Sequence, residues 1–354
     1  MLKTKTKVTI KNIADMAQTS MGTVDRIINN RGEVKDETRR NVMAIIDQMG
    51  FTPNLLAKSL ASKKIYNFIA VIPTAHENAP YWYKPMEGIK KGAAELKDFN
   101  IKVEFITFEI SSEKEFNKVC MQALTANPSG IVLAPVFKEA AYTFVLQLDK
   151  EKIPYVFIDI DQDRSENIAY FGQNAFQSGV VSARLFHHSI PSNSKLLILK
   201  LTNGGVISNQ LYKRELGFLE YFQHIKNGNY KIEAINIDIN EKGQPEKEFN
   251  NEITEQAGIS GIFVPNSRIY LLADWLKNSK LNTKLFLLGY DMIEQNVEHL
   301  KIGTIDFLIN QKPEEQGYKS IHCLFNHVVA GKKVEKYNSS VIEIMLKENI
   351  DYYN

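Results

Sequence analysis

Residues 9–28 read TIKNIADMAQTSMGTVDRII, and their pattern sets the structure expected at the start of the chain. Apolar residues recur at the three-and-four spacing of a helix face, first in 10–17 and again in 24–28. Thr9 and Ser20 stand just before these segments, where a side-chain oxygen can accept from free backbone N–H groups. The stretch therefore predicts two short helices joined by a tight turn.

A third helix is expected after Asp36, ending at Gly50. Its inward face is Val42, Ile45, Ile46 and Met49. Three short helices with a tight turn between the first two are typical of a helix-turn-helix, whose second helix enters the DNA major groove. A generic three-helix bundle without DNA function fits the periodicity equally well.

Charge is unevenly distributed along the chain of 354 residues. Residues 1–64 contain 12 Lys and Arg against 6 Asp and Glu, whereas the remainder contains 31 against 35. A basic head on a slightly acidic body indicates that the first part meets a polyanion such as nucleic acid. The 44% of hydrophobic residues is enough for at least two domains with cores of their own.

Residues 8–64 resemble the DNA-binding head of the lactose-repressor (LacI/GalR) family. The matching residues are Val8, Thr9, Ile10, Ile13, Ala14, Ala17, Thr23, Val24, Arg26, Asn29, Thr38, Arg39, Gly50, Phe51, Pro53, Asn54, Ala57 and Leu60. The resemblance implies a sequence-specific transcription regulator, typically a repressor, that binds double-stranded operator DNA. It also implies a homodimer, with a tetramer as the alternative.

Specific roles follow from this resemblance. The positions that read bases in the family are Met21, Gly22 and Arg26 here. Arg26 is the strongest candidate, because a guanidinium can take a guanine edge with two hydrogen bonds. Gly22 departs from the family, which often has a side chain there. Candidate phosphate contacts are Thr9, Ser20, Thr23 and Asn29.

Residues 53–65 are expected to form a hinge between a head at 1–52 and a body at 66–354. A segment of about ten residues is too short to be a stable helix alone. In the family, paired hinge helices lie in the minor groove, and a leucine at the position of Leu60 wedges between base pairs. Asn54 and Ala57 are further DNA-contact candidates by the same resemblance. The alternative is an amphipathic linker whose leucines pack on the body.

The body alternates apolar runs with amphipathic segments, a pattern that predicts buried parallel strands separated by helices. The expected strands are 67–73, 102–108, 130–135, 153–159 and 167–172, then 195–201, 231–238, 260–265, 284–290 and 303–309. Two such series indicate two doubly wound, Rossmann-like lobes, which makes the chain an all-α head on an α/β body. Arg214 to Phe218 and Gly289 to Asp291 resemble the family's effector domain, which shares its fold with periplasmic sugar-binding proteins.

A small-molecule site is expected between the lobes, where the strands end. The candidate residues are Asn78, Tyr81, Trp82, Asp159, Asn174, Arg214, Asn266, Asp291 and Gln311. Carboxylates accept hydrogen bonds from hydroxyls and aromatic rings cover C–H faces, so this set favours a sugar effector. Each residue has an alternative: helix caps for the aspartates, turn or cap roles for the amides, a surface ion pair for Arg214 and a packing role for Trp82. The effector could also be a nucleobase, a phosphorylated metabolite or a partner protein.

Other functional classes have little support in the sequence. The only cysteines, Cys120 and Cys323, lack metal-ligand spacing, and we expect neither a metal nor a cofactor. Local motifs for nucleotide binding, zinc proteases or nucleophilic catalysis are absent, so an enzyme is not expected. A solute-binding protein would suit the body, but the basic head and the lack of a secretory signal argue against it. No run reaches 18 apolar residues, and a cytoplasmic location is expected.

Overall fold

The structure is a computed structural model that describes residues 8–28, 31–51, 64–77, 79–226, 228–239, 245–254, 257–279, 281 and 284–353. The chain forms two compact units that divide between Lys63 and Lys64. Here they are called the head and the body. Except for its last two residues, the predicted hinge lies outside the described residues, as do the candidate residues Asn29, Asn54, Ala57, Leu60 and Asn78.

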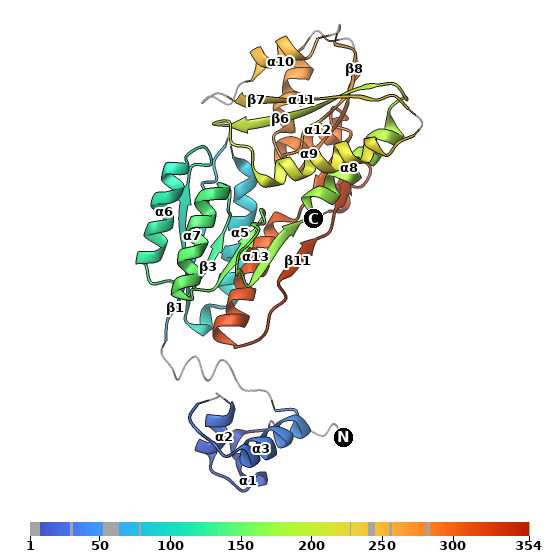
Figure 1. The fold of residues 1–354 in the computed structure, drawn as a ribbon. Helices are drawn as coiled ribbons and strands as arrows, with labels where there is room; N and C mark the ends of the chain where they lie inside the picture. The colour runs from blue at the N-terminus through green and yellow to red at the C-terminus, as the bar shows by residue number, and fades with distance from the viewer. Residues whose placement is uncertain are drawn as a thin grey trace. The chain divides into compact units, whose positions relative to one another are not determined.

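The head consists of α1 (Ile10–Met16), α2 (Met21–Ile28) and α3 (Asp36–Met49), as predicted (Figure 1). Thr9 caps α1 reciprocally with Asn12: Asn12 N donates to Thr9 Oγ1 at 3.3 Å, and Thr9 N donates to Asn12 Oδ1 at 2.9 Å. The helices meet in one small core whose buried members are Ile13, Ala14, Ala17, Val24, Ile27, Val42 and Ile45. This packing buries one face of α2 in the core and leaves its opposite face exposed to solvent.

Lobe 1 of the body is built on a parallel sheet in the order β11-β5-β4-β3-β1-β2. Its strands are β1 (Tyr66–Pro73), β2 (Ile101–Phe108), β3 (Gly130–Leu133), β4 (Tyr155–Ile158), β5 (Ala169–Gln173) and β11 (Tyr337–Ser340). Its helices are α5 (Tyr83–Glu95), α6 (Glu113–Thr125), α7 (Lys138–Glu151) and α13 (Pro313–Leu324). A short 3-10 helix, Pro80–Trp82, precedes α5.

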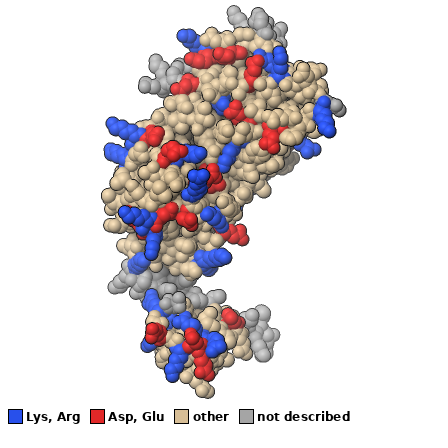
Figure 2. Space-filling model, viewed as in Figure 1, with Lys and Arg blue, Asp and Glu red and all other residues tan. Residues whose placement is uncertain are grey.

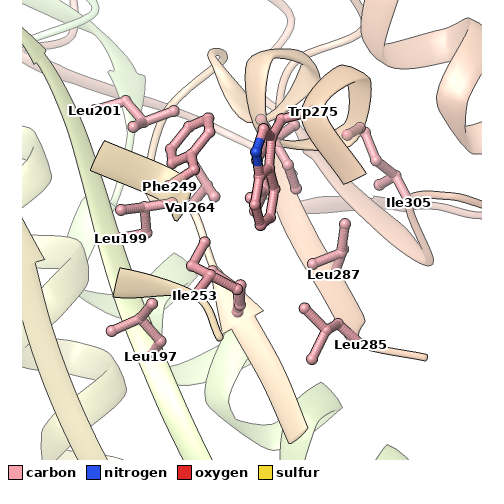
Figure 3. Close-up of a cluster of buried hydrophobic side chains, with 14 of the residues drawn as sticks. Leu197, Leu199, Leu201, Phe249, Ile253, Val264, Trp275, Leu285, Leu287 and Ile305 are labelled. Carbon is pink, nitrogen blue, oxygen red and sulfur yellow. The ribbon is translucent and has the colours of Figure 1, made fainter. Parts of the chain in front are cut away.

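Lobe 2 has the sheet order β12-β10-β9-β8-β6-β7, parallel except for β12. Its strands are β6 (Lys195–Asn203), β7 (Lys231–Ile239), β8 (Ile259–Phe263), β9 (Phe286–Tyr290), β10 (Phe307–Asn310) and β12 (Glu343–Met345). Its helices are α8 (Ala175–Ser189), α9 (Asn209–Gln223), α10 (Glu246–Glu252), α11 (Ile269–Asn278) and α12 (Glu294–Ile302). Figure 3 shows the cluster in which Leu199, Phe249 and Trp275 fill the space between this sheet and its helices.

Glycines bring α8 and α9 into close contact, and this contact places a functional side chain. A Cβ on Gly179 would lie 2.1 Å from the backbone oxygen of Arg214, and one on Gly217 would lie 2.0 Å from that of Phe176. Because neither helix could approach so closely with a larger residue, the two glycines position α9 and therefore Arg214.

Three passages of the chain join the lobes: between β5 and β6, between β10 and β11, and between β11 and β12. The buried side chain of Gln173 connects all three. Its Nε2 donates to the carbonyl oxygens of Asn310 (3.1 Å) and Val341 (3.0 Å), which belong to the other two passages. The lobes therefore share a hydrogen-bonded centre at the place where the strands end.

Candidate functional site

The solvent face of α2 is the candidate DNA interface. Val24 and Ile27 point into the head core, whereas Met21, Gly22 and Arg26 are exposed, Met21 by 56%. Ser20 Oγ accepts from Thr23 N at 3.1 Å and contacts Thr23 Oγ1 at 3.0 Å, which secures the first turn of the helix. A Cβ at Gly22 would meet only Ser20 Oγ, at 3.7 Å, so the backbone there is accessible to a ligand. This face would therefore present the guanidinium of Arg26, the thioether of Met21 and the open backbone at Gly22 to a DNA groove.

The candidate effector site is a cavity of about 90 Å³ in the body. By volume it has room for several water molecules or one small molecule. Residues of both lobes line it: Ala79, Pro80, Tyr81, Trp82, Ile110, Val136, Asp159, Ile160, Leu201, Asn203, Val206, Ser208, Gln210, Leu211, Arg214, Asn266, Ser267, Arg268, Asp291 and Gln311.

Two aspartates occupy equivalent positions at the ends of strands. Asp159 follows β4 with φ 64° and Asp291 follows β9 with φ 69°. Left-handed backbone is uncommon except in Gly, Asn and Asp, and it turns both carboxylates out of their sheets. Both side chains are buried and both line the cavity. The fold thus presents one carboxyl group from each lobe to the same space.

A hydrogen-bond network connects these carboxyl groups across the cavity. Tyr81 Oη donates to Asp159 Oδ1 at 2.7 Å, and Gln210 Nε2 donates to the same oxygen at 3.2 Å. Gln311 Nε2 lies 2.9 and 3.0 Å from the two oxygens of Asp291. Gln210 Nε2 also donates to Gln311 Oε1 at 2.9 Å. The network therefore runs from a lobe 1 carboxyl to a lobe 2 carboxyl through two glutamines.

Arg214 is the cation of this network and is only 1% exposed. Its Nη1 donates to Pro265 O at 2.8 Å and its Nη2 donates to Gln311 Oε1 at 2.6 Å. The guanidinium carbon lies 3.7 Å from the ring centre of Tyr290, a cation–π contact. A surface ion pair, the alternative considered for Arg214, is therefore not its role among the described residues.

Burial dominates the protonation of both carboxyl groups. It raises the pKa of Asp291 to about 7, opposed by Arg214 and by the hydrogen bond from Gln311. Burial also raises the pKa of Asp159, opposed by Tyr81, Arg214 and Gln210. Since desolvation disfavours the charged form, a bound ligand that donates hydrogen bonds would favour ionisation again.

The raised pKa predicts a pH-dependent stability of the body. Between its ordinary value of 3.8 and about 7, folded Asp291 holds a proton that the unfolded chain releases. The free energy of unfolding should therefore fall by about 1.4 kcal/mol per pH unit from pH 4 to 7 on account of Asp291, and level off above pH 7. Asp291→Asn, which suits the left-handed backbone, should remove this slope in urea titrations between pH 5 and 8. The exposed Asp98→Asn is the matched control. Equal slopes in wild type and Asp291→Asn would contradict the assignment.

The structure brings together most of the predicted effector residues. Seven of them line the cavity: Tyr81, Trp82, Asp159, Arg214, Asn266, Asp291 and Gln311. Trp82, 4% exposed, contacts Tyr81 edge to face and has one side on the cavity. Asn174 is elsewhere: it caps α8 by accepting from Gln177 N at 3.0 Å, and it lines a separate pocket beside Asp161 and Lys213.

Gln210 and Arg268 are two of the polar cavity residues that were not predicted. Gln210 lies one helical turn before Arg214 on α9, so helix periodicity from Arg214 indicates it. Arg268 lies two residues after Asn266, in the loop between β8 and α11, where the strand-end argument also expects ligand contacts.

Comparisons with known proteins agree with this arrangement. Residues 69–333 match the family described as periplasmic binding protein domain, and residues 9–54 match bacterial regulatory proteins of the lacI family. The chain therefore has a lacI-family domain at its head and belongs, over its body, to the periplasmic binding protein family. The predicted family and fold class are thereby confirmed.

Curated relatives of this chain are named as transcription regulators. DegA of Bacillus subtilis is 29% identical over 45% of this chain and 49% of its own length. The ribose operon repressor of Lactococcus lactis is 25% identical over 81% of this chain and 82% of its own length. The chain thus aligns to about half of DegA, and likewise to 45% of RegA of Clostridium acetobutylicum.

Solved structures match the body. A Bacteroides fragilis protein described as a LacI transcriptional regulator is 29% identical, with a TM-score of 0.76, over 82% of this chain and all of that one. GanP, a glucose-galactose binding protein of Geobacillus stearothermophilus, has a TM-score of 0.70 at 21% identity, over 81% of this chain and 99% of its own. At that identity the second match shows the fold alone.

Charged residues are mixed in sign on the side of the body seen in Figure 2. Blue and red side chains alternate there without a large area of one sign. Among the described residues, no helix is both long and apolar enough to span a lipid bilayer.

Proposed function

We propose that the protein is a repressor that recognises a pseudo-palindromic operator through α2, and whose operator affinity is controlled by a small sugar or sugar derivative in the body cavity. The observation that carries the proposal is the exposed face of α2, with Arg26 in its last turn, in a head that matches the lacI family. The protein would work in the cytoplasm, where its operator is, as a homodimer or as a tetramer.

The chemistry of the cavity supports a polyol effector. Two carboxyl groups, two glutamines and Asn266 surround a space that Trp82 bounds with a ring. A sugar presents vicinal hydroxyls that can donate to the carboxylates, and C–H faces that suit the ring. The name of one relative agrees, since it is a ribose operon repressor.

Control of DNA binding would follow from linkage between the two units. A ligand that contacts both lobes changes the relative stability of their different orientations, and such a change would be transmitted to the operator-binding head. Effector and operator then change each other's affinity by the same factor. Either sign of coupling is compatible with this scheme.

Operator binding is expected to depend steeply on salt. With about six to ten phosphate contacts, affinity should fall roughly 10³- to 10⁵-fold between 50 and 200 mM salt. Mobility-shift titrations on the protein's own promoter region measure this slope, with an unrelated duplex as the control. An affinity that does not change with salt, or equal binding to both duplexes, would contradict a sequence-specific DNA function.

A further inference from the structure

The cavity contains a second arginine with an unusual environment. Arg268 is the residue before α11, and its Nη1 donates to Leu201 O at 3.3 Å. Its Nε is enclosed and has no hydrogen-bond partner among the described residues, and no carboxylate there lies within ion-pair distance. Burial lowers the pKa of this guanidinium, while Tyr270 and Asp238 act in the opposite direction. Arg268 as a whole is only partly buried, but a guanidinium that loses water at its Nε without an ion-pair partner costs stability.

Arg268 is separate from the carboxyl groups of the cavity. Arg214 is the cation that acts on both Asp159 and Asp291, and its hydrogen bond to Gln311 joins it to their network. Arg268 instead bonds to the end of β6, beside Asn203 and Val206. Arg268 therefore has no hydrogen bond to either carboxyl group among the described residues, and the part of the cavity that it lines is here called the lobe 2 end.

Two helix N-termini add to the positive character of the lobe 2 end. Ser208 precedes α9 (15 residues) and Arg268 precedes α11 (10 residues), and both residues line the cavity. Helix N-termini favour anions through free N–H groups and the helix dipole. They support an anion here but would not establish one without the unpartnered Nε of Arg268.

We propose that the effector carries an acidic group, a carboxylate or a phosphate, and that Arg268 binds this group at the lobe 2 end of the cavity. The inference rests on the proposed function and names its effector class more closely. The hydroxyls of the same molecule meet Asp159 and Asp291, while its anion supplies the partner that Arg268 lacks. A neutral sugar would leave that guanidinium uncompensated, so acidic and neutral forms of one sugar should differ in affinity.

The test compares matched ligands on the full-length protein by thermal shift and calorimetry. The sugars are D-glucose, D-glucuronate and D-glucose 6-phosphate, then the corresponding galactose series, and sodium phosphate is used alone against sodium chloride of equal ionic strength. Wild type, Arg268→Gln and Arg184→Gln are compared, because Arg184 is an exposed lobe 2 arginine on α8.

Wild type and Arg184→Gln should bind an acidic member at least about tenfold more tightly than its neutral counterpart, and Arg268→Gln should lose that preference. Inorganic phosphate should likewise stabilise wild type more than Arg268→Gln. Tighter binding of the uronate would identify the acidic group as a carboxylate, and tighter binding of the sugar phosphate would identify it as a phosphate. Equal binding of acidic and neutral members, or equal phosphate stabilisation of both proteins, would overturn the proposal.

Ligand-free Arg268→Gln should melt at the wild-type temperature or above it, because the substitution removes an uncompensated charge. A fall of more than about 5 °C would mean that Arg268 has a structural role instead, and would also overturn the inference. A neutral sugar that binds and changes operator affinity would refute this inference but leave the proposed function intact. A protein that ignores operator DNA would remove the proposed function, whatever the anion preference.

Discussion

Replacing Arg26 with alanine is expected to abolish operator discrimination while leaving the head folded. The side chain is exposed on α2, one position before the buried Ile27, so its removal opens no cavity in the core. A guanidinium bonded to a guanine edge contributes about 1–3 kcal/mol of discrimination, or roughly 5- to 150-fold for each subunit. A dimer loses two such contacts, and the operator should then bind little better than random duplex.

Arg40→Ala is the control for charge, because Arg40 is an exposed arginine on α3 of the same head. This variant should weaken binding to the operator and to random duplexes by the same factor. The ratio of specific to random binding should stay unchanged, and the salt dependence of the affinity should decrease. Competition titrations with operator and random DNA separate the two effects. If Arg26→Ala keeps the wild-type ratio of specific to random binding, α2 does not read the operator as described.

Arg214→Met is expected to uncouple the effector from DNA. The variant keeps the length of the side chain over Tyr290 but loses the bonds to Pro265 and Gln311. Without that cation, both carboxyl groups lose the interaction that opposes their raised pKa, and Gln311 loses a donor that orients it. Effector binding should weaken by about 100-fold or more, because hydrogen bonds to charged groups contribute about 1.5–3 kcal/mol each.

Operator affinity of Arg214→Met without effector should stay within about threefold of wild type, and added effector should no longer change it. Arg184→Met, on the solvent side of α8, should respond normally. Mobility shifts with and without the ligand identified by thermal shift measure both properties. An Arg214→Met protein that still responds at wild-type ligand concentrations would show that the cavity is not the control site.

Sequence periodicity predicted those helices and strands in which apolar residues repeat at the spacing of a buried face. The ten long apolar strands and the three head helices are all present, because each buries a face that repeats along the chain. Strands β11 (YNSS) and β12 (EIM) were not predicted, because neither sequence has an apolar face that repeats along the strand. They pair only because the chain returns to β5 and β10.

The candidate site was predictable where a strand end places the residue. Asp159 and Asp291 follow buried strands, so topology alone brings them to the cavity. Asn174 also follows a strand, but its side chain is used by the first turn of α8. Gln173, one residue earlier, joins the three passages through contacts with residues more than a hundred positions away, which local patterns do not contain.

Selection of host genomic fragments with the purified full-length protein tests whether α2 recognises a DNA sequence under the control of the cavity. The selection is run with and without metabolite extract, and with Arg26→Ala in parallel. We expect wild type to enrich a small set of fragments that share one two-fold symmetric sequence, extract to change the yield, and Arg26→Ala to enrich none. Recovery of no common sequence by wild type under either condition would contradict this role of α2.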